Sequence, residues 1–228
     1  MVHRTSEEVT SHHIEKMGEA LGRQFDALWH NVAWLHREWA EYVELFGSKE
    51  TRVELLNQAA PQFFRMIQDA LWEETLLHVA RLTDKSTSPG RRQNLTIQNL
   101  PRLINDQKTK EHVTILVEKA VIEAMFCRDW RNRHIAHRDL DLATNQSAKP
   151  LEGASRKQVS QVLKAIADVL HAVEDHYMQS ETFFDGMHPA GGAVSLLHVL
   201  DAGVRAQAER SERRRRGDTS GNDYRPDI

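Results

Sequence analysis

One short stretch of the chain, from Arg128 to Asp141, gathers the residue types best suited to chemistry. It reads RDWRNRHIAHRDLD and sets four arginines, two histidines and three aspartates around one tryptophan. Histidine can transfer a proton near neutral pH, and arginine presents a planar fork of donors to a phosphate. Side chains of these types are suited to proton transfer and to contact with a phosphate.

The spacing within this stretch sets a condition on any joint action of Arg131 and His137. Side chains six residues apart on an ideal helix point about 120° apart, with about 9 Å of rise between them. They can converge if the helix ends between them, or if a second chain brings its own copy. The polar residues that begin at Asp139 favour a helix end close by.

The segment Arg131-Asn132-Arg133-His134-Ile135-Ala136-His137 resembles the motif of the HEPN superfamily. In that motif an arginine is followed by four to six residues and a histidine, at the end of a helix in an all-α bundle. The form RN…IAHRD is similar to the branch linked to abortive phage infection, the U-type Abi group. VARLTDKSTS, in which Asp84 ends a helix before a loop, resembles that branch too, and the likeness covers roughly Pro61 to Tyr177.

The resemblance implies a homodimer whose two motifs face each other, and in many members metal-independent cleavage of RNA. Arg131 would stabilise the transition state, His137 would transfer or orient a proton, and Asn132 would fix the helix end or contact the phosphate. The other assignments are RNA-backbone contacts by Arg128, Arg133, His134 and Arg138, a stacking face on Trp130, and support from Asp84 and Asp139. Asp139 could orient His137, or instead cap the chain or pair with an arginine.

Other interpretations of the same residues stay open. Arg128 and His134 have the same spacing, but the Asn after Arg131 and the Ala before His137 match the family better. Charged helix ends are commonly solvated faces. His134 and His137, with Asp141, could begin a zinc site, but no second cluster completes one, so neither a metal nor a cofactor is expected.

Three functions are compatible with these residues. The favoured one is an RNA-cutting toxin or defence factor, with RNA, a second copy of the chain and an antitoxin or other regulatory protein as candidate partners. The second is a non-catalytic HEPN module that binds RNA or a protein. The third is a purely structural helical protein. Phosphate-binding loops, dinucleotide glycine patterns, paired Cys-x-x-Cys and Gly-x-Ser-x-Gly are absent from the sequence, so those enzyme classes lack support.

Composition narrows the setting in which these functions would operate. The chain has 228 residues, of which 40 % are hydrophobic, and a formal net charge of -3, which argues against general coating of nucleic acid. The single cysteine, Cys127, forms no disulfide within the chain and is expected to be an inert, buried hydrophobe. Because the sequence lacks a secretory signal and a bilayer-spanning run, we expect a cytoplasmic protein that does not enter the membrane.

Apolar periodicity supplies the elements that must position the motif. A four-and-three spacing from Leu21 to Phe46, extended back to about Glu7, predicts one long N-terminal helix. Further helices are predicted after Pro61, from Thr109 into the motif, after a Ser155–Gln158 capping box, and from Val194 to about Arg210. Residues 139–153 are expected to be loop.

No convincing strand pattern is present, so the fold class is all-α: a HEPN-like helical bundle with a long N-terminal helix and a C-terminal helical extension. The expected organisation has an N-terminal helix and connection in residues 1–60 and the core in 61–180. A C-terminal helix at 181–210 and a flexible polar tail at 211–228 complete it.

Overall fold

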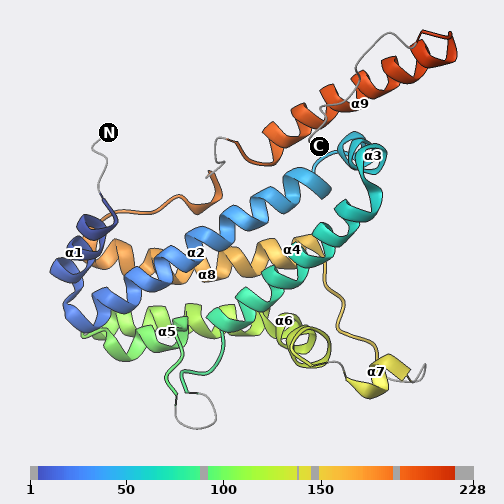
Figure 1. Ribbon diagram of the computed structural model, residues 1–228. Helices are drawn as coiled ribbons and strands as arrows, with labels where there is room; N and C mark the ends of the chain where they lie inside the picture. Colours follow the sequence, from blue (N-terminus) through green and yellow to red (C-terminus); the bar gives the residue numbers. More distant parts are fainter. Residues whose placement is uncertain (1–4, 88–91, 138, 145–148, 187–190, 219–228) are drawn as a thin grey trace. The chain divides into compact units, whose positions relative to one another are not determined.

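The computed structural model describes residues 5–87, 92–137, 139–144, 149–186 and 191–218. Throughout these ranges the regular structure is helical, apart from one isolated bridge between Thr87 and Gln93, which confirms the all-α fold. Figure 1 shows the helices in chain order. The α-helices are α1 (Ser6–Met17), α2 (Glu19–Phe46), α3 (Glu50–Ala59), α4 (Pro61–Leu82), α5 (Gln107–Glu123), α6 (Met125–Trp130), α7 (Leu140–Thr144), α8 (Arg156–Met178) and α9 (Ala193–Arg215). Three short turns of other helix types are η1 (Ile97–Leu103), η2 (Arg131–Ile135) and η3 (Phe184–Gly186).

The prediction of one unbroken N-terminal helix is wrong, because the helix ends at Gly18. Gly18 has a φ of 79°, in the left-handed range that glycine adopts without strain, and its N–H closes α1 on the carbonyl of Ile14. A capping box between Thr5 and Glu8 fixes the other end of α1. The apolar stripe from Leu21 onward belongs to α2 alone.

α1 folds back on the start of α2, and Gly22 makes this close approach possible. A Cβ atom at Gly22 would lie 2.6 Å from the Cα of Ile14 and 2.7 Å from the carbonyl oxygen of His13. His13 Nδ1 and Asp26 Oδ1 are 2.8 Å apart in a hydrogen bond that ties the two helices together. Sequence periodicity continued across Gly18 because both helices bury apolar residues in the same core.

The chain divides into two compact units, one formed by Met1–Trp39 with Leu71–Met187 and the other by Ala40–Ala70 with His188–Ile228. In the first unit α5 and α8 lie side by side along their lengths (Figure 1). The Ser155–Gln158 capping box predicted at the start of α8 is confirmed. The core of this unit consists of side chains with no exposed surface, among them Phe25, Leu28, Leu35, Leu76, Val79, Val113, Val162, Ile166 and Leu170.

In the second unit, the start of α9 is held by a side chain from α2. Glu41 accepts a hydrogen bond from the backbone N–H of Ala193, and the carboxylate occupies the space that a side chain at Gly192 would need. Apolar residues of α2, α3, α4 and α9 form a small core around these contacts. Its buried members are Leu45, Leu56, Phe64, Ala193 and Leu197.

Two further boundary predictions need correction. α9 continues to Arg215 instead of stopping near Arg210, because Arg, Glu and Ala favour helix and Glu212 pairs with Arg216 one turn later. Residues 211–215 of the predicted flexible tail are therefore helical, and residues 219–228 lie outside the described ranges. Within the predicted loop at 139–153, residues 140–144 form the short helix α7, whose backbone Asp139 caps.

Candidate functional site

The helix that carries the Arg–His motif changes its hydrogen-bonding pattern at the motif itself. α5 is interrupted at Ala124, α6 follows, and residues 131–135 then form a π-helical turn in which the N–H of Ala136 reaches the carbonyl of Arg131 at 2.8 Å. Single π turns inside helices are frequent at functional sites. The chain bends at Ala136 and His137, so the helix does end between Arg131 and His137.

Arg131 is held by an aspartate that lies 47 residues earlier in the chain. Its Nη1 pairs with the Asp84 carboxylate just beyond the end of α4, and its Nε donates to Asn132 Oδ1 at 3.0 Å. The side chains remain 23 % and 30 % exposed, so the ion pair is accessible to a ligand. A guanidinium has five N–H donors, and these contacts leave the Nη2 group available to a phosphate.

His137 is exposed and hydrogen-bonds to no other residue in the described part of the chain. Asp139 does not contact its ring. Instead, its Oδ1 accepts the backbone N–H of Leu142 at 3.1 Å and its Oδ2 lies 3.4 Å from Arg133 Nε. The Leu142 N–H, with a smaller contribution from Arg133, lowers the pKa of the Asp139 carboxyl from its ordinary value. Asp139 thus caps the chain and pairs with an arginine, the alternative left open by the sequence.

Arg128 is directed into the protein. Its guanidinium donates to the carbonyl oxygens of Thr83 and Val121, each at 3.1 Å, and so closes the ends of α4 and α5. Burial lowers the pKa of this guanidinium, while the nearby Asp84 carboxylate opposes the shift. This role differs from the expected contact with the RNA backbone, although Arg128 still adds positive charge next to Arg131.

Arg133 and Trp130 attach the motif to the segment that precedes α8. Arg133 donates to the carbonyl of Lys149 at 2.6 Å, and the indole N–H of Trp130 donates to the carbonyl of Glu152 at 2.9 Å. The N–H of Glu152 in turn donates to Asp129 at 2.9 Å. Both residues therefore hold the chain after the motif, and Arg138 falls outside the described ranges.

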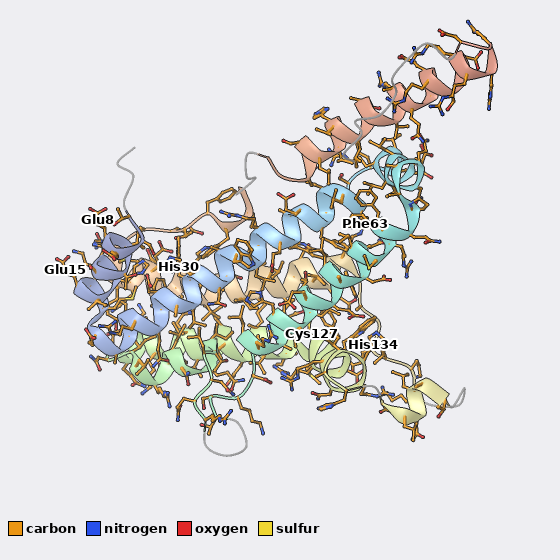
Figure 2. The ribbon with its side chains drawn as sticks, in the orientation of Figure 1. Glu8, Glu15, His30, Phe63, Cys127 and His134 are labelled. Carbon is orange, nitrogen blue, oxygen red and sulfur yellow. The ribbon has the colours of Figure 1, made fainter. Side chains whose placement is uncertain are left out.

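His134 faces α4 and not Arg131. Its Nε2 lies 3.2 Å from Glu73 Oε1, and its ring meets the Trp130 ring edge to face with centroids 5.6 Å apart. Figure 2 labels both His134 and Cys127. Cys127 is fully buried, and burial raises the pKa of its thiol to about 12. Arg128 and His134, which have the same spacing as Arg131 and His137, therefore contact different partners. Arg128 donates to carbonyl oxygens near the ends of α4 and α5, and His134 contacts Glu73.

The structure adds residues to the site that the sequence did not assign to it. Lys85, Asn94 and Gln98 come from the segment after α4 and line a pocket that Arg131 also borders. They are separated from Arg131 by more than 30 residues. Lys85 lies within the VARLTDKSTS segment, whereas Asn94 and Gln98 belong to no recognisable motif. Among the described residues, no three His, Cys, Asp or Glu side chains are arranged to hold a metal ion.

These features define a class of protein: an all-α domain with an arginine and a histidine at the end of a helix, as in HEPN domains. A family model described as AbiU2 matches residues 18–190, and the chain therefore belongs to the AbiU2 branch of the HEPN superfamily, which is associated with abortive infection. No curated protein and no solved structure matches the chain. No helix in the described ranges has the length and apolar character needed to cross a membrane.

Proposed function

We propose that this protein is a metal-independent endoribonuclease that acts as a toxin in defence against phage. The observation that carries the proposal is the placement of the motif on a π-helical turn, where Asp84 fixes Arg131 and the His137 ring stands in solvent. This arrangement leaves an accessible cation and an accessible proton carrier at adjoining turns of one chain. Two copies facing each other would supply two of each.

The proposed reaction moves protons and breaks one bond without oxidation or reduction. The ribose 2′-oxygen forms a bond to the adjacent phosphorus, and the bond from phosphorus to the 5′-oxygen breaks. One His137 accepts the proton from the 2′-hydroxyl, and the His137 of a second copy donates a proton to the departing 5′-oxygen. The free donors of Arg131 stabilise the negative charge on the phosphoryl oxygens.

The products of this reaction distinguish it from hydrolysis by a metal nuclease. Purified protein incubated with RNA in EDTA is expected to leave 2′,3′-cyclic phosphate and 5′-hydroxyl ends. His137→Ala should lower the cleavage rate about 10²- to 10⁴-fold, the usual contribution of a general acid or base. Arg131→Ala should have a similar effect, because it removes charge stabilisation in the transition state.

A matched control is His112→Ala, which removes an exposed histidine on α5 and should leave the rate unchanged. In cells, the His137 and Arg131 variants should relieve growth arrest on expression, whereas the His112 variant should not. RNA binding without cleavage by the unaltered protein would contradict the enzymatic proposal. It would favour a HEPN module that recognises phosphate and leaves it intact.

A further inference from the structure

A pocket of about 480 Å³, with Arg131 among its lining residues, lies in the first compact unit. The segment after α4 forms one side of it with Lys85, Asn94 and Gln98, and the end of α5 and the motif form the other with Val121 and Arg131. Its volume falls within the range of pockets that hold small molecules, about 300 to 1,000 Å³. The motif thus borders a partly open pocket as well as the free surface.

The charge of this pocket favours an anionic group. Three cations line it, Lys85, Arg128 and Arg131, against the single carboxylate of Asp84. Lys85 is exposed and forms no ion pair with any described residue, so its ammonium is available to a ligand. Lys85 and the free N–H groups of Arg131 could therefore both contact the same phosphate.

The segment that carries Lys85 also offers hydrogen-bonding groups of a different kind. The side-chain nitrogen of Gln98 donates to the carbonyl of Thr83 at 2.8 Å, which fixes the amide so that its oxygen remains an acceptor. The side-chain nitrogen of Asn94 similarly donates to the carbonyl of Lys85 at 2.8 Å. Val121, on the other side of the pocket, adds an apolar surface. A fixed amide beside an apolar surface is suited to the edge and face of a nucleobase.

We propose that this pocket holds one nucleotide of the RNA, adjacent to the scissile linkage, with its phosphate against Lys85 and Arg131 and its base against Gln98 and Val121. The inference rests on the proposed function, because Arg131 belongs to both the pocket and the catalytic pair. In this proposal the segment after α4, which lies outside the Arg–His motif, determines where the RNA is cut.

Binding can be measured without cleavage, which separates this proposal from the catalytic one. The probes are the four ribonucleoside 5′-monophosphates, inorganic phosphate and the four nucleosides, titrated calorimetrically into the unaltered protein and into His137→Ala. The monophosphates should bind both proteins equally and more tightly than phosphate or nucleosides. A lack of monophosphate binding at millimolar concentration would overturn the proposal.

Three variants locate the binding. Lys85→Glu should lower the affinity for all four monophosphates on the order of tenfold, because it places a negative charge beside the phosphate. Val121→Trp should abolish binding by filling the pocket. Lys108→Glu, which changes an exposed lysine at the start of α5, should have no effect. Folding is checked by circular dichroism, and unchanged affinity in both folded pocket variants would overturn the proposal.

Base recognition and the source of the nucleotide need their own comparisons. Gln98→Leu should change the relative affinities of the four monophosphates, and in active protein it should move the preferred cleavage positions. A short RNA made uncleavable by 2′-O-methyl groups should displace the bound monophosphate. If the RNA leaves it bound, the pocket holds a free nucleotide and the proposal is wrong.

The two proposals can fail separately. Cleavage with unaltered rate and position in Lys85→Glu and Gln98→Leu would overturn the pocket and leave the ribonuclease intact. Monophosphate and RNA binding that depends on Lys85, in a protein that cuts no RNA, would overturn the ribonuclease and leave the pocket intact.

Discussion

At the scale of single residues, the most informative contact is the ion pair between Asp84 and Arg131. Asp84 holds one nitrogen of the guanidinium, and Asn132 holds another. Such contacts orient a flexible side chain, but the aspartate also lowers the net positive charge that a bound RNA would meet. In the proposed reaction Asp84 would therefore be a positioning residue with opposing effects on the rate of cleavage and on RNA affinity.

Asp84→Asn should separate these two effects. The amide keeps the shape of the side chain but loses its charge, so Arg131 is held less firmly and kcat should fall about 10- to 100-fold. The KM for RNA should fall or stay constant, because a negative charge has left the binding surface. Steady-state kinetics on a defined RNA provides the measurement.

The matched control is Asp69→Asn, which removes the carboxylate from the exposed ion pair between Arg65 and Asp69 on α4. It should leave both constants unchanged. If Asp84→Asn lowers the free energy of unfolding as well as kcat, and raises KM, its role is merely structural and the prediction is contradicted.

At the scale of elements, two junctions determine how the first unit is assembled. The turn at Gly18 returns α1 along α2, and the segment after α8 is fastened to α2 and α8 by polar contacts. Glu174 accepts hydrogen bonds from Thr182 and Ser180, and Trp29 donates to Thr182 at 2.8 Å. His36 meets Asp185 at 3.0 Å in the same segment.

Gly22→Ala should weaken the packing of α1 on α2. The added methyl group would lie 2.6 Å from the Cα of Ile14. That atom belongs to the backbone of α1, which cannot move aside as the end of a flexible side chain can. The expected loss is about 1 to 3 kcal/mol in the free energy of unfolding, measured by denaturant titration. Gly203→Ala in α9 meets nothing within 4 Å and should be neutral or stabilising by up to about 1 kcal/mol. Equal effects of the two substitutions would contradict this account.

The stability of the first unit should decrease in mildly acidic solution. Burial lowers the pKa of His36 from 6.5, more than the facing Asp185 raises it, and burial lowers the pKa of His78 in the same way. Below pH 6.5 the unfolded chain therefore binds more protons than the folded one. The free energy of unfolding should fall as the pH decreases from that value toward the folded-state pKa.

The pH dependence can be assigned to His36 by substitution. His36→Leu removes this titration, so the slope of unfolding free energy against pH should become shallower, while His78 still contributes. His198→Ala, at an exposed position on α9, should retain the slope of the unaltered protein. An unchanged slope in His36→Leu would show that this histidine is not the source.

At the scale of the whole molecule, the distribution of charge matters more than its total. The net charge of -3 gives the chain no general attraction for nucleic acid, whereas three cations surround the pocket beside the motif. RNA binding should therefore depend on a few local contacts. Each chain carries one Arg131 and one His137, and the proposed reaction uses two histidines.

We expect cleavage to require two copies of the chain. The activity per chain should rise with protein concentration until dimers saturate, and analytical ultracentrifugation should show dimers over the same range. Mixing excess His137→Ala protein into the unaltered protein should suppress activity, because mixed dimers lack one proton carrier. Constant activity per chain across a monomeric concentration range would contradict a composite site.

The sequence by itself determined the helical class, the family and the motif. Helical periodicity and caps depend on residues within one or two turns of each other, which is why the Ser155 box and the all-α class were predicted correctly. The Arg–x5–His spacing is equally local. Gly18 was the exception, because the same apolar period continued on both sides of a helix end.

Only the tertiary structure decided what each side chain of the motif contacts. Arg131 meets Asp84 across 47 positions, and His134 meets Glu73 across 61. Arg128 points into the protein although its residue type suggested a surface contact. Such pairings follow from the way α4 packs near α6, and periodicity within one helix carries no information about the side chains of another. The pocket beside Arg131 arises for the same physical reason, since its walls come from segments that folding alone brings together.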